Sequence, residues 1–339
     1  MNLRRLALLG GVAAGTLATP LRGLVAQPAA RRPRIALIFE DVPLAAMAGP
    51  EPASRYARAF VLRLRELGWN DGSNLVIERR SSGNRAEQLP ALMQEMIALR
   101  VDAIVASGAG AIAASNATGN IPIVALIDNP EGFGLTGSLA RPTRNVTGLT
   151  AEAGPGMEGK RLQLLKEAAP AARRVAVIDF KYIDARATPG THARRLEMEA
   201  AARTLGVSLV HVGVDRVEDI EPAFRSIVDQ HADAMLELGN LIEERQRVVD
   251  FAARQRLPAA YPAREYAELG GLFAYGANLA HLWRRAADFT DRILRGAKPA
   301  DLPFEQPTHF EFVINAKAAK ALGLTLPNSL LLRADEVIE

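Results

Sequence analysis

The sequence predicts an α/β protein made of two Rossmann-like lobes, each with a doubly wound parallel sheet, joined by a hinge of three strands. Two observations predict the lobes. Short β-branched runs alternate with amphipathic stretches, and this rhythm restarts after a loop rich in Gly, Pro and Thr at 137–150. A third observation predicts the hinge, because one more strand, helix and strand follow the second sheet and would carry the chain back to lobe one and out again.

In lobe one, strand-like runs are separated by helical stretches. Apolar residues at helical spacing from Tyr56 to Leu67 predict a helix that ends at Gly68. A second helix is expected near 89–96, and a short one rich in Ala follows Gly108. The strands are expected at 34–39, 74–80, 102–107 and 121–127.

Lobe two and the segment after it are predicted by the same patterns. Helices are expected at 157–168, 191–205, 217–230 and 241–256, and strands at 173–178, 208–214, 233–238 and 258–261. The hinge elements are a strand at 271–276, a helix with Leu282, Ala286, Phe289 and Ile293 on one face, and a strand at 309–315. We expect lobe one to comprise 34–147 and 276–300, and lobe two 148–275 and 301–339.

Composition narrows the function classes. The chain has 339 residues, of which 49% are hydrophobic, enough for two cores of ordinary size. Its formal net charge is only +3 and its basic residues form no stripe, so we expect no nucleic-acid partner. It has no cysteine, which excludes disulfides, thiolate ligands and a cysteine nucleophile.

Residues 1–30 have the pattern of a secretory signal peptide. Arg4 and Arg5 precede an apolar run at 6–17, and small residues surround Ala26. A membrane anchor is the alternative, but Gly, Pro and Arg22 interrupt the run well short of the roughly 20 apolar residues that span a bilayer. We therefore expect an exported protein of the periplasm.

The stretch "VASGAGAIAA" at 105–114 raises the possibility of a nucleotide cofactor. Gly108, Gly110 and Ala113 fill the G-x-G-x-x-[G/A] pattern of dinucleotide-binding turns, and an exported nicotinamide-dependent oxidoreductase is one reading. However, the pattern follows the third strand and not the first, where that fingerprint usually lies. Exposed amides at a helix start also hold any small anion or carboxylate.

Other enzyme signatures fail. "GPGMEGKR" at 154–161 nearly matches a phosphate-binding P-loop, but Arg161 stands where the Mg²⁺-binding hydroxyl is required. None of the five histidines forms a pair at i, i+4, and no G-x-S-x-G turn occurs; these are His192, His211, His231, His281 and His309. We expect a binding protein with no catalytic residues, no cofactor and no metal.

Nearly all of the chain from Arg34 onward resembles the ABC-transporter substrate-binding proteins, some of which bind aromatic amino acids. The resemblance is carried by "FVLRLRELGWNDGSNLVIERR", "IPIVALIDNPEGFGLTGSLARPTRNVTGLT", "GKRLQLLKEAAPAARRVAVI", "LPAAYPAREYAELGGLFAYG" and the final segment from 287 to 339. It implies the type I periplasmic binding protein fold, with a ligand held between the lobes. It also implies delivery to a membrane permease, although a ligand-sensing protein without a permease remains an alternative.

The ligand is expected where strands end at the interlobe face. The predicted contacts are Glu40, Ser107, Gly108, Ala109, Asp128 and Asn129 from lobe one, and Asp179, Tyr182, Gly239, Asn240, Tyr261 and Glu265 from lobe two. Tyr182 and Tyr261 would stack on an apolar or aromatic ligand, and Asp179 or Glu265 would pair with an ammonium group. Where the family usually has G-T-P after Ser107, this chain has the small residues of "GAGAI". We expect the protein to be a monomer whose lobes close on a small solute.

Overall fold

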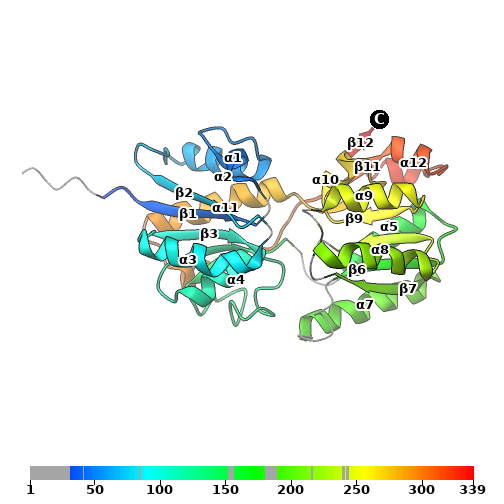
Figure 1. Cartoon of the computed structure of the whole chain (residues 1–339), viewed down its shortest axis with the longest axis horizontal. Coiled ribbons are helices and arrows are strands. Elements are labelled where there is room, and N and C mark those ends of the chain that lie inside the picture. Colours follow the sequence, from blue (N-terminus) through cyan, green and yellow to red (C-terminus); the bar gives the residue numbers. More distant parts are fainter. Residues whose placement is uncertain are drawn as a thin grey trace, which may run out of the picture. The chain divides into compact units, whose positions relative to one another are not determined.

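A computed structural model of the chain describes residues 31–40, 42–83, 85–151, 156–179, 189–214, 217–238, 241 and 244–339. All the described helices and strands lie within 33–339. They form two mostly parallel sheets, each covered by helices on both faces (Figure 1). The predicted fold class, an α/β protein of two lobes, is confirmed.

Lobe one has a five-stranded parallel sheet in the order β2-β1-β3-β4-β5. Its strands are β1 (Arg34–Phe39), β2 (Val76–Ser81), β3 (Ala103–Ser107), β4 (Ile123–Leu126) and β5 (Val146–Leu149). Its helices are α1 (Leu44–Met47), α2 (Arg55–Glu66), α3 (Leu89–Ala98), α4 (Gly108–Ala117) and α11 (Leu279–Leu294), with short 3₁₀ turns at Ala86–Gln88 and Pro299–Asp301.

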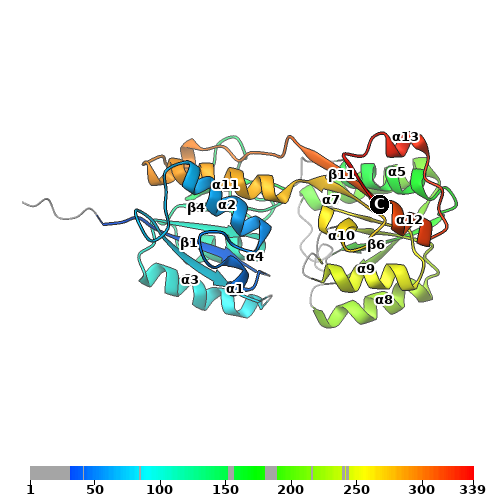
Figure 2. The ribbon, with the colours of Figure 1, turned by 90° about the horizontal axis from the view of Figure 1, so that it is seen from above.

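The two faces of this sheet are covered by different helices. Helices α2 and α11 lie side by side on one face in both views (Figures 1 and 2), and α3 and α4 cover the other. Phe60 of α2 packs edge-on against Trp283 of α11, which stacks on Phe39 of β1. Central strands such as β1 are apolar throughout because both of their faces are buried.

Lobe two has a seven-stranded sheet in the order β12-β11-β10-β9-β8-β6-β7, in which only β10 and β11 pair antiparallel. Its strands are β6 (Arg174–Asp179), β7 (Ser208–Gly213), β8 (Ala234–Glu237), β9 (Ala259–Tyr261), β10 (Phe273–Ala277), β11 (Phe310–Asn315) and β12 (Glu336–Ile338). Its helices are α5 (Met157–Ala168), α7 (Pro189–Leu205), α8 (Ile220–Asp229), α9 (Arg245–Arg254), α10 (Arg264–Glu268), α12 (Ala316–Ala321) and α13 (Asn328–Leu331), with a 3₁₀ turn at Val217–Asp219.

One part of the predicted loop at 137–150 is a buried strand, so that interpretation was wrong for β5. The strand contains Gly148, whose φ is +150°, and a Cβ there would collide with the carbonyl oxygen of Ala125 on β4. Only glycine permits this close approach of two backbones. The same glycine made the sequence look like a turn.

The chain passes between the sheets after β5, after β10 and again before β11. After β10, Asn278 begins α11 by accepting a hydrogen bond from the amide of His281 at 2.7 Å. On the return, Glu305 pairs with β5 through hydrogen bonds that join its amide to Gly148 and its carbonyl to Thr150. Among the described residues, no helix is long and apolar enough to cross a bilayer.

Candidate functional site

The sheet of lobe one has a topological switch point between its neighbouring strands β1 and β3. The helices that follow these strands, α2 and α4, cover opposite faces of the sheet. Open α/β sheets bind ligands outside the carboxyl ends of their strands at such a point. Here Glu40 directly follows β1 and Ser107 ends β3, so the structure places these two predicted residues at one edge.

The Glu40 carboxylate lies at the start of α4. Its Oε1 is 3.5 Å from the amide nitrogen of Gly110, which donates to it, and a Cβ at Gly108 would collide with the same oxygen. The φ of Gly108 is +47°, in the left-handed region that favours glycine. Gly108 therefore makes room for the protein's own carboxylate at the positive helix end, and the amide of Gly110 donates to it. A dinucleotide pyrophosphate would meet like charge there.

The other predicted residues of this edge have different surroundings. Asn129 Oδ1 accepts a hydrogen bond of 2.8 Å from the amide of Gly132, so its oxygen stabilises the turn after β4. Asp128 is exposed immediately before it, and Ala109 is half-buried in the first turn of α4. The carboxyl edge of lobe one therefore carries the carboxylates of Glu40 and Asp128, while the amide oxygen of Asn129 is already bonded within its own turn.

The predicted residues of lobe two divide into three groups. Tyr182, Gly239 and Asn240 lie outside the described residues, and of Asp179 only the backbone, at the end of β6, is described. Tyr261 is fully buried, with its ring stacked on Tyr266 at a centroid distance of 4.7 Å. The structure does not bring that ring to a surface.

Burial is also the main cause that raises the pKa of Tyr261, and the neighbouring carboxylate of Glu237 adds to it. Glu237 ends β8, is fully buried, and accepts a hydrogen bond of 3.0 Å from the amide of Leu241. No pattern in the sequence indicated this carboxylate as a candidate site residue, since it occurs in an otherwise apolar run. Glu237 and Tyr261 thus end two neighbouring strands of lobe two, and both side chains are buried there.

Glu265 is the predicted residue that contacts the other lobe. It lies in the first turn of α10, and its Oε1 accepts a hydrogen bond of 3.1 Å from the guanidinium of Arg55, the first residue of α2. Arg55 also donates to both oxygens of Glu268, at 3.2 and 3.0 Å. The Arg55 side chain is 43% exposed but that of Glu265 only 13%, so the carboxylate is the shielded partner. We call Arg55, Tyr56, Glu265 and Glu268 the α2–α10 junction.

Two polar atoms of the junction are buried and form no hydrogen bond of standard geometry among the described residues. They are the Tyr56 hydroxyl and Glu265 Oε2. Burial raises the pKa of Tyr56, and the Glu265 carboxylate beside it raises that pKa further through its charge and a weak side-chain hydrogen bond, whereas Arg55 and Arg245 oppose the shift. Arg245 is the first residue of α9. A hydroxyl, a carboxylate oxygen and two guanidinium charges thus meet where the lobes contact each other.

Sequence reasoning missed Tyr56, Arg55 and Arg245. Tyr56 was predicted only as an apolar residue of its helix, because its spacing matches the buried stripe of α2. A usable signal existed, since the helix that follows each parallel strand starts at the edge where that strand ends. All three residues are at or next to a helix start.

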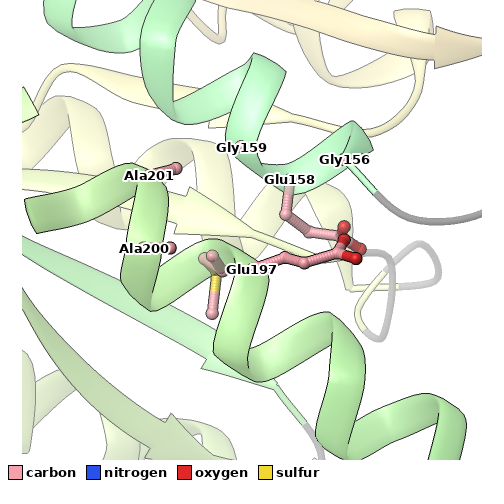
Figure 3. A pocket seen from close by; sticks show the side chains of 7 residues that line it. Gly156, Glu158, Gly159, Glu197, Ala200 and Ala201 are labelled. Atoms are coloured by element: carbon pink, nitrogen blue, oxygen red, sulfur yellow. The ribbon is translucent and has the colours of Figure 1, made fainter. Parts of the chain in front are cut away.

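A surface pocket of about 490 Å³ lies between α5 and α7 (Figure 3). Its lining includes Gly156, which precedes α5, and the carboxylates of Glu158 and Glu197, which Figure 3 shows pointing to the same side. Arg161 is 3% exposed and donates through Nε to the Tyr275 carbonyl at 2.7 Å. Two carboxylates and a buried arginine do not suit a nucleotide triphosphate. In the part of the chain that is described, no three His, Cys, Asp or Glu side chains form a group suited to a metal ion.

Comparison with known proteins gives one family. A family model described as "ABC transporter substrate binding protein" matches residues 54–338. A tyrosine-binding protein of Clostridioides difficile (strain R20291) is 25% identical over 285 residues, covering 82% of this chain and 80% of that protein. The crystal structure of an ABC domain in complex with L-Trp from Streptococcus pneumonia matches with a TM-score of 0.79 at 22% identity, covering 91% of this chain and all of that one. A conserved domain protein of Vibrio cholerae matches with the same TM-score, identity and coverage.

Proposed function

Because the chain belongs to the ABC transporter substrate-binding protein family, we propose that it captures a small solute bearing an ammonium group at the α2–α10 junction and delivers it to a membrane permease. The two lobes supply opposite sides of this junction. Contacts between the ligand and both lobes would then favour the arrangement of the lobes that encloses the ligand.

The observation that carries this proposal is a pair of buried atoms, the Tyr56 hydroxyl and Glu265 Oε2, that form no hydrogen bond of standard geometry among the described residues. A buried carboxylate oxygen or hydroxyl without a partner costs about 1–3 kcal/mol. An ammonium group has three donors and satisfies a carboxylate through charge-assisted hydrogen bonds. A ligand that carries an ammonium group therefore removes this free-energy cost when it binds, whereas the ligand-free protein still bears it.

We propose an α-amino acid as the ligand class. The relatives bind tyrosine in one case and L-Trp in another, and both carry an ammonium and a carboxylate. Glu265 complements the ammonium, and the positive charge of Arg245 beside Tyr56 complements the carboxylate. The remaining predicted contacts, such as Ser107 and Asn129, stay proposals.

A thermal-shift screen against amino acids, carboxylates and nucleobases tests the ligand class. A bound solute raises the unfolding temperature by mass action. We expect stabilisation by at least one amino acid and by no simple carboxylate. If no amino acid stabilises the protein, the proposed class is wrong.

A matched pair of variants tests the site. Glu265→Gln removes the negative charge of the carboxylate that contains Oε2. Glu268→Gln removes a negative charge from the same helix, at a carboxylate whose two oxygens both already accept hydrogen bonds from Arg55. We expect Glu265→Gln to weaken binding by roughly tenfold or more and Glu268→Gln by much less, measured by calorimetry. Equal losses in the two variants would place the ligand elsewhere.

We further propose that residues 1–30 are a signal peptide and that the mature chain acts as a monomer in the periplasm. The support is the n-region with Arg4 and Arg5, the apolar run after it, and the family's usual place outside the cytoplasm. The intact mass of the chain recovered from periplasmic extracts should correspond to a start near residue 27. Recovery of the full-length chain from the cytoplasm alone contradicts this.

A further inference from the structure

Two histidines that are distant in the sequence meet at the hinge. His281 lies in the first turn of α11, and His309 immediately precedes β11. Their ring centroids are 5.7 Å apart and their planes are 83° from parallel. Both side chains are exposed, so the pair lies open to solvent and not within a core.

The backbones that carry the two rings belong to different lobes. Helix α11 packs on the sheet of lobe one, and β11 is a strand of the sheet of lobe two. Asn278 holds the two together locally, because it caps α11 through the amide of His281 and donates through Nδ2 to Glu311 Oε1 at 2.7 Å. The rings therefore start from anchored positions.

From this geometry we propose that His281 and His309 together bind a divalent transition-metal ion such as Zn²⁺, Ni²⁺ or Cu²⁺. Imidazole is a preferred ligand of these ions. With metal–nitrogen bonds of about 2.1 Å, two imidazoles on one ion have ring centroids roughly 5–6 Å apart, which matches the observed 5.7 Å. Water completes the coordination, as the exposure of both rings allows.

The charges around the pair permit a bound cation. Arg284 and Arg285, one turn along α11, are already paired with Glu66 and Glu305. Glu311, two residues after His309, is paired with Arg264 at 3.2 Å, so this arginine also has a carboxylate partner. With two protein ligands, the site is weaker than a four-ligand structural zinc site.

A metal at this position links the start of α11 to the approach to β11, across two of the chain's passages between the lobes. It therefore favours the arrangement of the lobes in which the two rings converge. This role is separate from the α2–α10 junction and does not depend on the proposed ligand.

The test is calorimetric titration of the full chain, without an affinity tag of histidines, with Zn²⁺ alone. We expect one ion per chain and a rise in unfolding temperature on saturation. Losing even a supporting partner of a metal ligand typically weakens affinity 10–100-fold, so His281→Ala and His309→Ala should each cost at least about tenfold. The double variant should show no saturable binding of Zn²⁺, because no imidazole is left at the site.

The control is His231→Asn, at an exposed histidine after α8 whose φ is +53°, a conformation that Asn tolerates. It should leave Zn²⁺ affinity unchanged. Absence of saturable binding by the unaltered chain overturns the proposal. So does a Zn²⁺ affinity that is unchanged in His281→Ala or in His309→Ala, or a loss as large in His231→Asn as in either of them.

Discussion

Two regions of this protein place a tyrosine beside a glutamate, and they differ in what surrounds the pair. In the core of lobe two, Tyr261 lies near Glu237, fully buried and stacked on Tyr266. At the α2–α10 junction, Tyr56 lies near Glu265 where two lobes meet and part of the site reaches solvent. Neither tyrosine hydroxyl forms a hydrogen bond of standard geometry among the described residues. The difference teaches that an unpartnered polar atom indicates binding only where a ligand can reach it.

The largest effect expected from this comparison is on stability. Tyr261→Ala removes a ring from the stacked core and should lower the free energy of unfolding by about 3–5 kcal/mol, as for other buried aromatic residues. Tyr56→Ala, at the edge of its lobe, should cost clearly less. Urea unfolding measures both. Similar costs for the two variants would break the distinction between core and junction.

The second prediction removes only the hydroxyl groups. Tyr56→Phe should weaken binding of the amino acid found in the screen by roughly five- to tenfold, because one hydrogen bond contributes about 1 kcal/mol. Tyr261→Phe should leave affinity unchanged and stability equal or slightly higher, since its hydroxyl is buried without a partner. Calorimetry on the two variants gives the answer. A loss of affinity confined to Tyr261→Phe would reverse the assignment of the two regions.

The comparison also explains what the sequence could and could not predict. Helical periodicity located α2 and α5 well, because a buried stripe every three or four residues is visible without tertiary context. The strand β5 was missed because it is four residues long and contains Gly148, whose role is a close contact with β4. Length and composition cannot show such a contact.

For the site, strand order was a coarse guide. The end of β9 was a reasonable place for a ligand contact, but side chains alternate between faces of a strand, and Tyr261 points into the core. Glu265 was among the predicted contacts because it follows that strand closely, whereas Tyr56 fitted an apolar helical pattern and was predicted only as a core residue. His281 and His309 could not be paired from spacing, because the hinge brings them together from separate segments.

The third prediction concerns the ion pair that joins the two sides of the junction. Arg55 is 43% exposed, and ion pairs at such sites typically contribute only about 0–1 kcal/mol. Arg55→Ala should therefore shift the free energy of unfolding by less than about 1 kcal/mol, and that difference should disappear in 1 M salt, where screening is strong. A larger effect that persists in high salt would mean that Arg55 packs as part of a core. The surroundings of the junction would then resemble the buried surroundings of Tyr261.

The smallest effect is expected at a glutamate that belongs to neither region. Hydrogen bonds from Arg284 and Arg63 lower the pKa of Glu66 to about 2, from 4.5. A lowered pKa in the folded state means that the contribution of Glu66 to stability is present above about pH 4.5 and is lost as pH falls toward 2. Glu66→Gln should therefore lower stability slightly at neutral pH, where the carboxylate contributes, leave stability near pH 2 unchanged, and so flatten the acid part of the curve of stability against pH. Acid titrations of the variant and the unaltered chain, followed by circular dichroism, measure this difference. Because both arginines share the surface of α2 and α11 within lobe one, a change in ligand affinity in this variant would show that the junction responds to charges beyond its own four residues.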